Sequence, residues 1–266
     1  MISFPEIDPV IFSIGPLAVR WYGLMYLLGF AAAFVLGKKR AERSDSPLIA
    51  SEVDDLIFYG ALGAVLGGRF GYVLFYGFER WLEEPLWLFK VWEGGMSFHG
   101  GLLGVTLAMW LYARRIKKPF GALCDFVAPL APLGLGFGRL ANFINAELYG
   151  RATDVPWAMV FPTDPFQLPR HPSQLYQLLL EGVLLFLLVW VYSSKPRVRY
   201  QVAGLFLLGY ASARLAVEFV REPDASLAFD WMTRGQMLSI PMFLLGLFLL
   251  LRPVLRPVIT HSNQKP

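Results

Sequence analysis

The stretch LAVRWYGLMYLLGFAAAFVLG (residues 17–37) decides the fold class of this chain. It carries a single charged residue, Arg20, and the basic residues Lys38, Lys39 and Arg40 follow it directly. A helix that crosses a bilayer needs roughly 20 mainly apolar residues, because the hydrocarbon core is about 30 Å thick and each residue rises about 1.5 Å. The stretch therefore predicts a transmembrane helix. Because no Lys or Arg precedes Arg20, we do not expect a cleavable signal peptide here.

Further apolar stretches follow along the chain. Of its 266 residues, 56% are hydrophobic and only 17% are charged, and the mean hydropathy is +0.49. A soluble domain usually carries about 25% charged residues. These values favour an all-α polytopic membrane protein with seven transmembrane helices, forming one membrane-embedded domain over residues 1–266. The predicted spans are 17–37, 56–76, 97–113, 123–144, 174–192, 202–220 and 236–251.

Basic residues gather in alternate loops between these stretches. The loops rich in Lys and Arg hold the groups within 38–43, 114–118, 195–199 and 252–265. Because positive residues stay on the cytoplasmic side, this bias predicts an N-terminus outside and a cytoplasmic C-terminus. We expect a small periplasmic head at 146–172, between the fourth and fifth spans, and a flexible cytoplasmic tail at 253–266. Topology accounts for the net charge of +4, so we do not expect nucleic-acid binding.

Few residues in the chain could ligate a metal. Cys124 is the only cysteine, which excludes an internal disulfide and a Cys-rich metal site. The three histidines, His99, His171 and His261, leave little material for a His-based site. The sequence contains no P-loop, Rossmann fingerprint, GxSxG elbow or HExxH motif. We therefore expect neither a metal nor an organic cofactor.

The polar residues of the predicted spans converge on one leaflet. A central arginine costs about 2.5–3.5 kcal/mol on insertion scales, so such residues normally face a bundle interior and carry function. With the predicted orientation, the residues toward the outer leaflet are Tyr22, Arg69, His99, Arg139, Asn142, His171, Arg214, Glu218 and Arg221. Since guanidinium groups suit phosphate oxygens, the pattern indicates a site for the phosphate of a phospholipid.

The segment GRLANFINAELYG (138–150) carries the densest group of these residues. The Pro and Gly residues of APLAPLGLGFG (128–138) predict a kinked helix before it. Arg139 and Asn142 are three residues apart and so share a helix face. The polar residues that follow, where the helix is expected to break, are Asn145, Glu147 and Gly150. They cap the helix or line a cavity; a polar helix end without function is the alternative.

Two other segments place titratable groups in the same region. In SARLAVEFVRE (212–222), Arg214, Glu218 and Arg221 recur at i, i+4 and i+7. We expect Glu218 to pair with one arginine and the other to stay free for an anion; a structural ion-pair ladder is the alternative. Glu181 is a candidate buried partner for an arginine. His99 lies at a span entrance before two glycines, where it acts as a general base or as a structural hydrogen-bonding residue.

Seven segments of the chain resemble the prolipoprotein diacylglyceryl transferases of the bacterial inner membrane. The resemblance runs in order from about Arg20 to Met242, and the element GRxxNFxNxExxG is highly specific. The segments are RWYGLMY, GGRFGYVLFY, MSFHGGLLG, FGRLANFINAELYG, RHPSQLYQ, RLAVEFVREPD and GQMLSIPM. The chain departs from the pattern at Gln177, where relatives often carry glutamate, which puts the role of a carboxylate there in doubt.

The resemblance implies an enzyme that moves the sn-1,2-diacylglyceryl group of phosphatidylglycerol onto the lipobox cysteine of a prolipoprotein. A thioether forms and sn-glycerol 1-phosphate leaves, as the first step of lipoprotein maturation. The implied partners are phosphatidylglycerol, the prolipoprotein signal peptide and the lipid bilayer. We expect the catalytic residues to be His99, Arg139 and Arg214. The expected substrate-binding residues are Tyr22, Arg69, Asn142, Asn145, Glu147, Gly150, His171, Tyr210, Glu218 and Arg221.

Two other functions would also use arginines within a membrane. An anion or lipid transporter needs them along its permeation path, although the halves of this chain show no convincing internal repeat. A non-catalytic assembly factor would use them to bind anionic lipid. A flux assay in liposomes separates the transporter from an enzyme, because an enzyme should show no substrate-dependent flux. For the assembly factor, Arg139→Ala should weaken lipid binding, and there should be no catalytic activity to lose.

Overall fold

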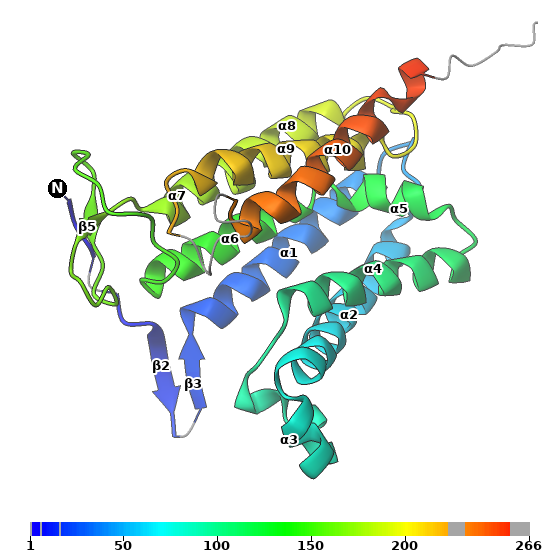
Figure 1. Ribbon diagram of the computed structural model, residues 1–266. Coiled ribbons are helices and arrows are strands. Elements are labelled where there is room, and N and C mark those ends of the chain that lie inside the picture. The colour runs from blue at the N-terminus through cyan, green and yellow to red at the C-terminus, as the bar shows by residue number, and fades with distance from the viewer. Residues whose placement is uncertain (1, 6, 16, 223–231, 256–266) are drawn as a thin grey trace, which may run out of the picture. The chain divides into compact units, whose positions relative to one another are not determined.

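The computed structural model describes residues 2–5, 7–15, 17–222 and 232–255, which are mostly helical (Figure 1). The helices are α1 (Trp21–Ala41), α2 (Ala50–Tyr76), α3 (Phe78–Glu83), η1 (Pro85–Phe89), η2 (Val91–Glu93), α4 (Phe98–Arg115), α5 (Phe120–Val127), α6 (Ala131–Ile144), α7 (Ser173–Gln177), η3 (Leu178–Leu184), α8 (Leu185–Tyr192), α9 (Gln201–Glu218) and α10 (Arg234–Leu255). The strands are β1 (Ile2–Ser3), β2 (Val10–Ile14), β3 (Leu17–Arg20), β4 (Met159–Val160) and β5 (Pro169–Arg170).

The chain forms two compact units. One comprises Met1–Ala33 and Val127–Pro266, and the other comprises Phe34–Phe126. The first unit is called the main unit below and the second the α2–α4 unit. Most of the polar residues singled out in the sequence belong to the main unit, whereas Arg69 and His99 belong to the α2–α4 unit.

Several helices are long and apolar enough to cross a membrane. Four qualify within the described residues, and the bent pair α5 and α6 would make a fifth if it is one span. The four are Trp21–Ala41, Ala50–Tyr76, Ser173–Tyr192 and Arg234–Arg252. The prediction of a multi-pass helical membrane protein is therefore confirmed. The helices at the third and sixth predicted spans, α4 and α9, are not among these candidates, so the number seven stays a prediction.

The first predicted span begins later than expected. Residues Leu17–Arg20 form strand β3, which pairs antiparallel with β2, and helix α1 starts only at Trp21. Gly15 between the strands has φ +58°, a left-handed conformation that glycine adopts without steric cost. The apolar run alone could not reveal this hairpin, because a strand and a helix end can share the same hydrophobicity.

The fourth predicted span is broken. Helices α5 and α6 meet at an angle of 49° around residues 128–130, where Pro129 lies between them and Pro132 stands in the first turn of α6. Proline lacks the N–H that would continue the helix, and its ring clashes with the preceding turn. The predicted kink is thus confirmed. At the other end of the chain, α10 continues to Leu255, so the predicted flexible tail is helical at its start, and residues 256–266 lie outside the described residues.

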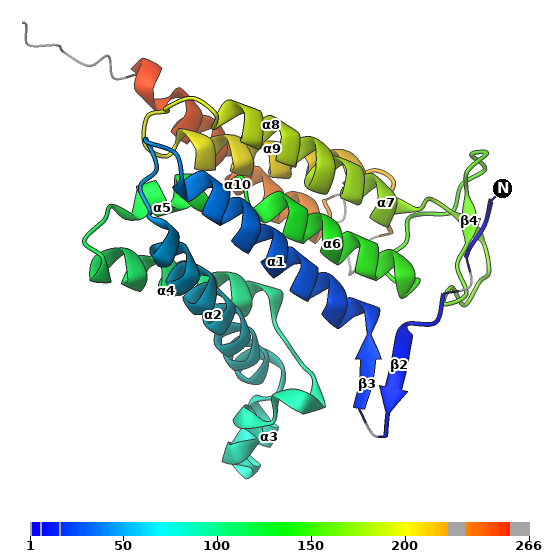
Figure 2. The ribbon, with the colours of Figure 1, turned by 180° about the vertical axis from the view of Figure 1, so that it is seen from behind.

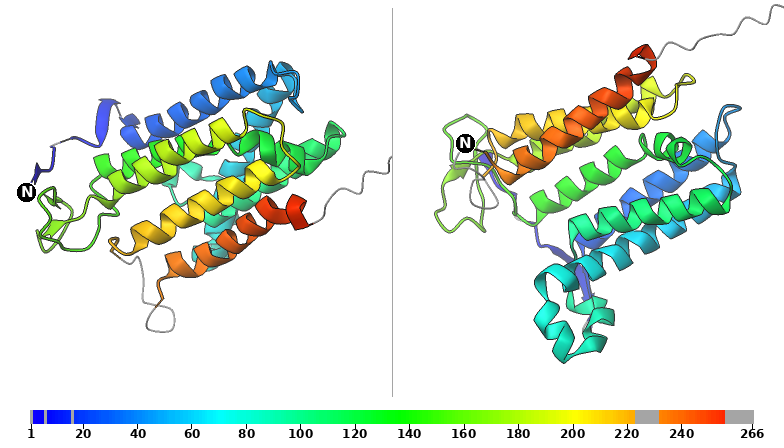
Figure 3. Two further views of the ribbon diagram at one scale, coloured as in Figure 1. Left: turned by 90° about the horizontal axis from the view of Figure 1, so that it is seen from above. Right: turned by 45° about the vertical axis from the view of Figure 1, so that its right-hand side comes forward.

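Close helix contacts in the main unit depend on glycines. The α-carbons of Gly136 on α6 and Gly182 on η3 are so close that a Cβ on Gly182 would lie 2.7 Å from Gly136 Cα. A similar approach at Gly204 and Gly246 joins α9 to α10, which lie side by side in Figure 3. Helix α1 lies beside α6 (Figure 2) and packs on it through Met25, Ala141 and Ile144. These contacts set the distances between the polar side chains described below.

Segment η3 is a π-helical turn between α7 and α8. Such turns insert one extra residue per turn and are frequent at functional sites. Here the turn contains Glu181 and Gly182, both buried, on the side that faces α6. The α2–α4 unit is held by an analogous glycine contact, since a Cβ on Gly104 would lie 2.1 Å from the carbonyl oxygen of Gly63.

The segment at 146–172, predicted to form a small head, is folded around a short sheet. Strand β4 pairs with β5 in antiparallel and with the N-terminal β1 in parallel orientation. An apolar cluster of Phe143, Ala146, Met159 and Phe161 attaches this sheet to the end of α6. The sheet adds short strands to the expected all-α architecture.

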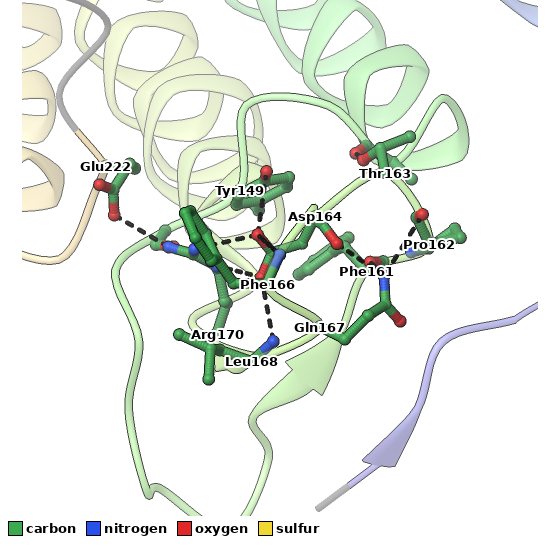
Figure 4. Close-up of polar contacts among 12 residues, drawn as sticks. Tyr149, Phe161, Pro162, Thr163, Asp164, Phe166, Gln167, Leu168, Arg170 and Glu222 are labelled. Carbon is green, nitrogen blue, oxygen red and sulfur yellow. Dashed lines mark hydrogen bonds and ion pairs between the residues drawn. The ribbon is translucent and has the colours of Figure 1, made fainter.

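A buried ion pair organises the same segment (Figure 4). Arg170 donates from Nε and Nη2 to the Asp164 carboxylate at 2.7 and 3.0 Å, and its Nη1 donates to Glu222 at 3.0 Å. Asp164 also accepts the backbone N–H groups of Phe166 and Leu168. Asp164 is 1% exposed. This pair was not predicted from the sequence.

We expect Asp164→Asn to destabilise the protein at neutral pH by roughly 3 kcal/mol, the low end of the cost of breaking a buried pair, because Arg170 keeps Glu222. Hydrogen bonds from Arg170, and then those from Leu168 and Phe166, lower the pKa of Asp164 from 3.8 to about 2. A carboxylate with a depressed pKa in the folded state stabilises fully above pH 3.8 and loses that contribution as the pH falls through about 2.

The difference in thermal stability between wild type and Asp164→Asn should therefore be largest at pH 7 and shrink below pH 4. Thermal unfolding of the purified protein between pH 7 and pH 2.5 measures it. Asp154→Asn is the matched control, since Asp154 is an exposed carboxylate of the same segment. An equal difference at every pH would contradict the role assigned to the Asp164 charge.

Candidate functional site

Arg139 on α6 is held by a buried carboxylate. Its Nε donates to Glu181 Oε2 at 3.0 Å, and Gln177 Nε2 donates to the other carboxylate oxygen at 2.9 Å. Gln177 and Glu181 are fully buried, whereas the side chain of Arg139 keeps 18% of its surface exposed. The prediction that Glu181 is the buried partner of an arginine is confirmed.

Helix α9 brings a second arginine to the same region. Tyr210 interacts electrostatically with Glu181, Arg139 and Arg214. Arg214, one turn further along α9, forms an ion pair with Glu218. Both partners are buried, Arg214 at 9% and Glu218 at 3% exposure. The structure thus brings together the two predicted catalytic arginines around one tyrosine.

The stripe on α9 differs from its prediction in one respect. Glu218 pairs with one arginine, as expected, but the other arginine is not free. Arg221 is 4% exposed and has polar partners, its backbone pairs with Gly150, and its carbonyl oxygen accepts Arg151 Nε at 2.9 Å. The expectation of an arginine left free at this position is wrong, because the chain turns at the end of α9 and buries Arg221 against 150–151.

The start of α10 covers the Arg214–Glu218 pair. A Cβ on Gly235 would lie 2.7 Å from Arg214 Nη2 and from both carboxylate oxygens of Glu218. Thr233 and Gln236 fix this helix end by exchanging hydrogen bonds between each side chain and the other's backbone N–H, at 3.0 and 3.1 Å. A larger residue at this position would have to displace the ends of these two charged side chains. Gly235 is the first residue of the segment GQMLSIPM and was not predicted as a site residue.

A second cluster of polar residues, Tyr22, Asn142 and Glu147, lies at the end of α6. Asn142 donates from Nδ2 to Glu147 Oε1 at 2.8 Å, and Asn142 and Glu147 both interact with the hydroxyl of Tyr22 on α1. Two non-glycine residues with left-handed backbones, Ala146 (φ 53°) and Leu148 (φ 59°), flank Glu147 and turn the chain back. Such strained positions cluster at functional sites. The structure therefore unites three of the predicted binding residues.

Gly150 and His171 form a third contact near these groups. The N–H of Gly150 donates to the carbonyl of His171 at 2.8 Å. A Cβ on Gly150 would lie 2.5 Å from the carbonyl oxygen of Val220 and 2.6 Å from His171 Cβ. His171 Nδ1 lies 3.2 Å from the hydroxyl of Tyr176, and burial lowers the pKa of the imidazole. Asn145 ends α6, and within the described residues its side chain has no hydrogen-bond partner.

The α2–α4 unit holds the two remaining predicted residues. His99 is exposed in the first turn of α4, edge-on to Phe98, and Ser97 caps that helix. Arg69 is 2% exposed and its three guanidinium nitrogens donate to backbone carbonyls. These carbonyls belong to Trp87, Leu88, Gly94 and Gly95. Arg69 also stacks on the Trp87 ring, 4.7 Å from its centroid, so it organises the segment at 85–95 that contains η1 and η2.

Two buried residues of α7, Ser173 and Gln174, belong to the polar interior although neither was predicted as a site residue. Gln174 is fully buried and donates to the carbonyl of Glu147 at 2.7 Å, and Ser173 donates to the carbonyl of Leu148 at 3.0 Å. The spacing of Gln174, Gln177 and Glu181 at i, i+3 and i+7 was the available signal, because it places three polar groups on one helix face. Within the described residues, no cluster of three or more His, Cys, Asp or Glu side chains could hold a metal.

Comparisons with known proteins show the family of this chain. The sequence pattern of the family described as prolipoprotein diacylglyceryl transferase matches residues 9–252. The chain is 57% identical to a phosphatidylglycerol–prolipoprotein diacylglyceryl transferase of Marinomonas sp., covering 92% of this chain and 93% of that protein. It is 57% identical to enzymes of the same name from Acinetobacter baylyi (94% and 93% covered) and Legionella pneumophila (94% and 98% covered). The chain therefore belongs to the prolipoprotein diacylglyceryl transferase family.

Proposed function

We propose that this protein transfers the sn-1,2-diacylglyceryl group of phosphatidylglycerol to the lipobox cysteine of a prolipoprotein, and so begins lipoprotein maturation. Relatives that bear the name of this activity cover more than nine tenths of the chain. The observation that carries the proposal is the pair of arginines, Arg139 and Arg214, gathered around Tyr210 in a unit of membrane-spanning helices. The comparisons give the transporter alternative no support.

The reaction breaks a carbon–oxygen bond of the lipid. The cysteine thiolate attacks the carbon of the diacylglyceryl unit that bears the phosphate, and a carbon–sulfur bond forms. The electron pair of the broken carbon–oxygen bond leaves with the oxygen of sn-glycerol 1-phosphate. Negative charge grows on the departing phosphate, so donors already fixed around it lower the barrier. We assign this task to the guanidinium groups of Arg139 and Arg214, which match phosphate oxygens in geometry.

The thiol must lose its proton before it attacks. A free cysteine has a pKa of about 8.5, so only a small fraction is thiolate at pH 7. We assign the base to His99, an exposed imidazole at the start of α4, and the proton passes to its unprotonated ring nitrogen. No step needs a metal or an organic cofactor.

The other predicted residues bind the substrates in this proposal. Tyr22, Asn142 and Glu147 form one hydrogen-bonded group that offers a hydroxyl and an amide to the lipid head group. Gly150, His171 and Arg221 shape the chain reversal beside that group. Tyr210 and Glu218 orient the two arginines. Arg69 contributes to substrate binding by holding the segment at 85–95. Asn145 contributes to substrate binding from its position at the end of α6.

The proposal includes a membrane topology. The seven predicted spans, with the N-terminus outside and the C-terminus in the cytoplasm, place the arginines in the periplasmic leaflet of the bacterial inner membrane. The basic ends of α1 and α4, which carry Lys38, Lys39 and Arg40 in one and Arg114 and Arg115 in the other, then lie on the cytoplasmic side. The signal peptide of the prolipoprotein reaches the site from the bilayer.

The direct test uses purified protein, phosphatidylglycerol vesicles and a peptide with a lipobox cysteine. We expect mass spectrometry to show the gain of one diacylglyceryl unit on the cysteine, with stoichiometric release of glycerol phosphate. A peptide with serine in place of the cysteine, and vesicles without phosphatidylglycerol, should give no product. A folded protein that yields no modified peptide, but moves anions or lipid in a liposome flux assay, would return the function to transport.

A further inference from the structure

We propose that Gln177 and Glu181 are positioning residues that aim the Arg139 guanidinium at the departing phosphate; this inference rests on the proposed function. Glu181 contacts Arg139 but lies fully buried, so it reaches a substrate only through that arginine. Gln177 contacts Glu181 and is fully buried as well. The three side chains form one chain of hydrogen bonds that runs from α7 through η3 to α6.

The two oxygens of Glu181 have separate tasks. Oε2 accepts Arg139 Nε at 3.0 Å, and Oε1 accepts Gln177 Nε2 at 2.9 Å. With both oxygens occupied, the carboxylate cannot rotate without losing a hydrogen bond. Arg139 is bound through Nε, the nitrogen nearest its stem, which leaves the fork of terminal nitrogens beside Tyr210. Fixed donors of this kind stabilise a developing charge better than mobile ones.

The backbone is built to bring these groups together. Gly136 precedes Arg139 by three residues, Gly182 follows Glu181 directly, and a Cβ on Gly182 would lie 2.7 Å from Gly136 Cα. The π-helical turn of η3 contains both Glu181 and Gly182. This close contact lets a side chain of α6 reach a carboxylate on the neighbouring helix. A pair needed only to neutralise a charge would not require such a constrained approach.

The amide of Gln177 has a defined orientation. Its nitrogen must face Glu181, because the reverse orientation would bring the amide oxygen against a carboxylate oxygen. Its own oxygen, Oε1, is buried and has no donor among the described residues. The side chain thus leaves one hydrogen-bonding group unsatisfied and still donates to Glu181, which favours a role in orienting that carboxylate.

The test compares Glu181→Gln with an exchange variant, Gln177→Glu combined with Glu181→Gln. Glu181→Gln keeps the shape but removes the charge that holds Nε. We expect kcat to fall roughly 30-fold, while KM for phosphatidylglycerol changes less than about threefold, because the arginine remains but is no longer aimed. The exchange variant keeps one buried carboxylate and one amide, and we expect its kcat to stay roughly tenfold below wild type.

The controls separate positioning from folding. Glu83→Gln removes an exposed carboxylate of α3 and should leave kcat and thermal stability unchanged. Glu181→Asp, which keeps the charge on a shorter stem, should recover part of the lost kcat. A Glu181→Gln enzyme with wild-type kcat would overturn the inference, and so would an exchange variant that restores both kcat and thermal stability. If the wild type itself transfers no diacylglyceryl group, the proposed function fails, and the two failures are thereby distinguished.

Discussion

Arg139→Lys should reduce diacylglyceryl transfer by about a thousandfold while the protein stays folded. Lysine keeps the positive charge, but it is a point charge without the planar fork of arginine. It cannot donate to Glu181 at the Nε position and also present two parallel donors to a phosphate. The loss of one fixed donor to a developing oxyanion typically costs 10²–10³ in kcat. The expected loss lies at the upper end of this range, because lysine loses both the hydrogen bond from Nε to Glu181 and the planar pair of terminal donors.

The measurement is single-turnover transfer to a lipobox peptide, with thermal unfolding in detergent recorded on the same preparation. Arg197→Lys is the matched control, since Arg197 stacks on Tyr192 in a loop that carries no predicted site residue. The control should transfer at the wild-type rate. If Arg139→Lys retains more than a tenth of wild-type activity, charge alone would suffice at this position and the assigned role of the guanidinium fork would be wrong.

Gly150→Ala should have the second largest effect, because it strains the backbone that surrounds the site. The added Cβ would lie 2.5 Å from the carbonyl oxygen of Val220 and 2.8 Å from that of His171. Neither atom belongs to a flexible side-chain end, so the two strands of chain must separate. Overpacking of this kind costs typically 1–3 kcal/mol. A displacement of about 1 Å in positioned groups can cost roughly 10²-fold in rate, and we expect a loss of that size in transfer.

In Gly150→Ala, the temperature of thermal unfolding and kcat should both fall. In Arg139→Lys, only kcat should fall. Gly60→Ala is the control, because a Cβ at Gly60 meets nothing within 4 Å. It should preserve both properties. Wild-type stability in Gly150→Ala would show that the contact with 220 and 171 relaxes without cost, and the glycine would then have no role in shaping the site.

Much of the membrane architecture could be predicted from the sequence, because the length of an apolar run and the position of a proline act locally. The helix at 21–41, the break around Pro129 and the basic residues at the ends of α1 and α4 all follow from neighbouring residues. Where long-range pairing competes, the local signal fails. Leu17–Arg20 form a strand because they pair with Val10–Ile14, and nothing within 17–37 shows that.

The candidate site divides in the same way. The sequence by itself determined which polar residues lie within apolar helices, since their types and spacing can be counted along the chain. Only the tertiary structure decided their partners, which are Glu181 for Arg139 and Glu218 for Arg214. It also decided that Arg221 is buried. Arg139 and Glu181 meet because Gly136 and Gly182 let two backbones approach, and Asp164 and Arg170 because the short sheet folds back. An ion pair depends on the distance between atoms in space, which the packing of helices sets and spacing along the chain does not.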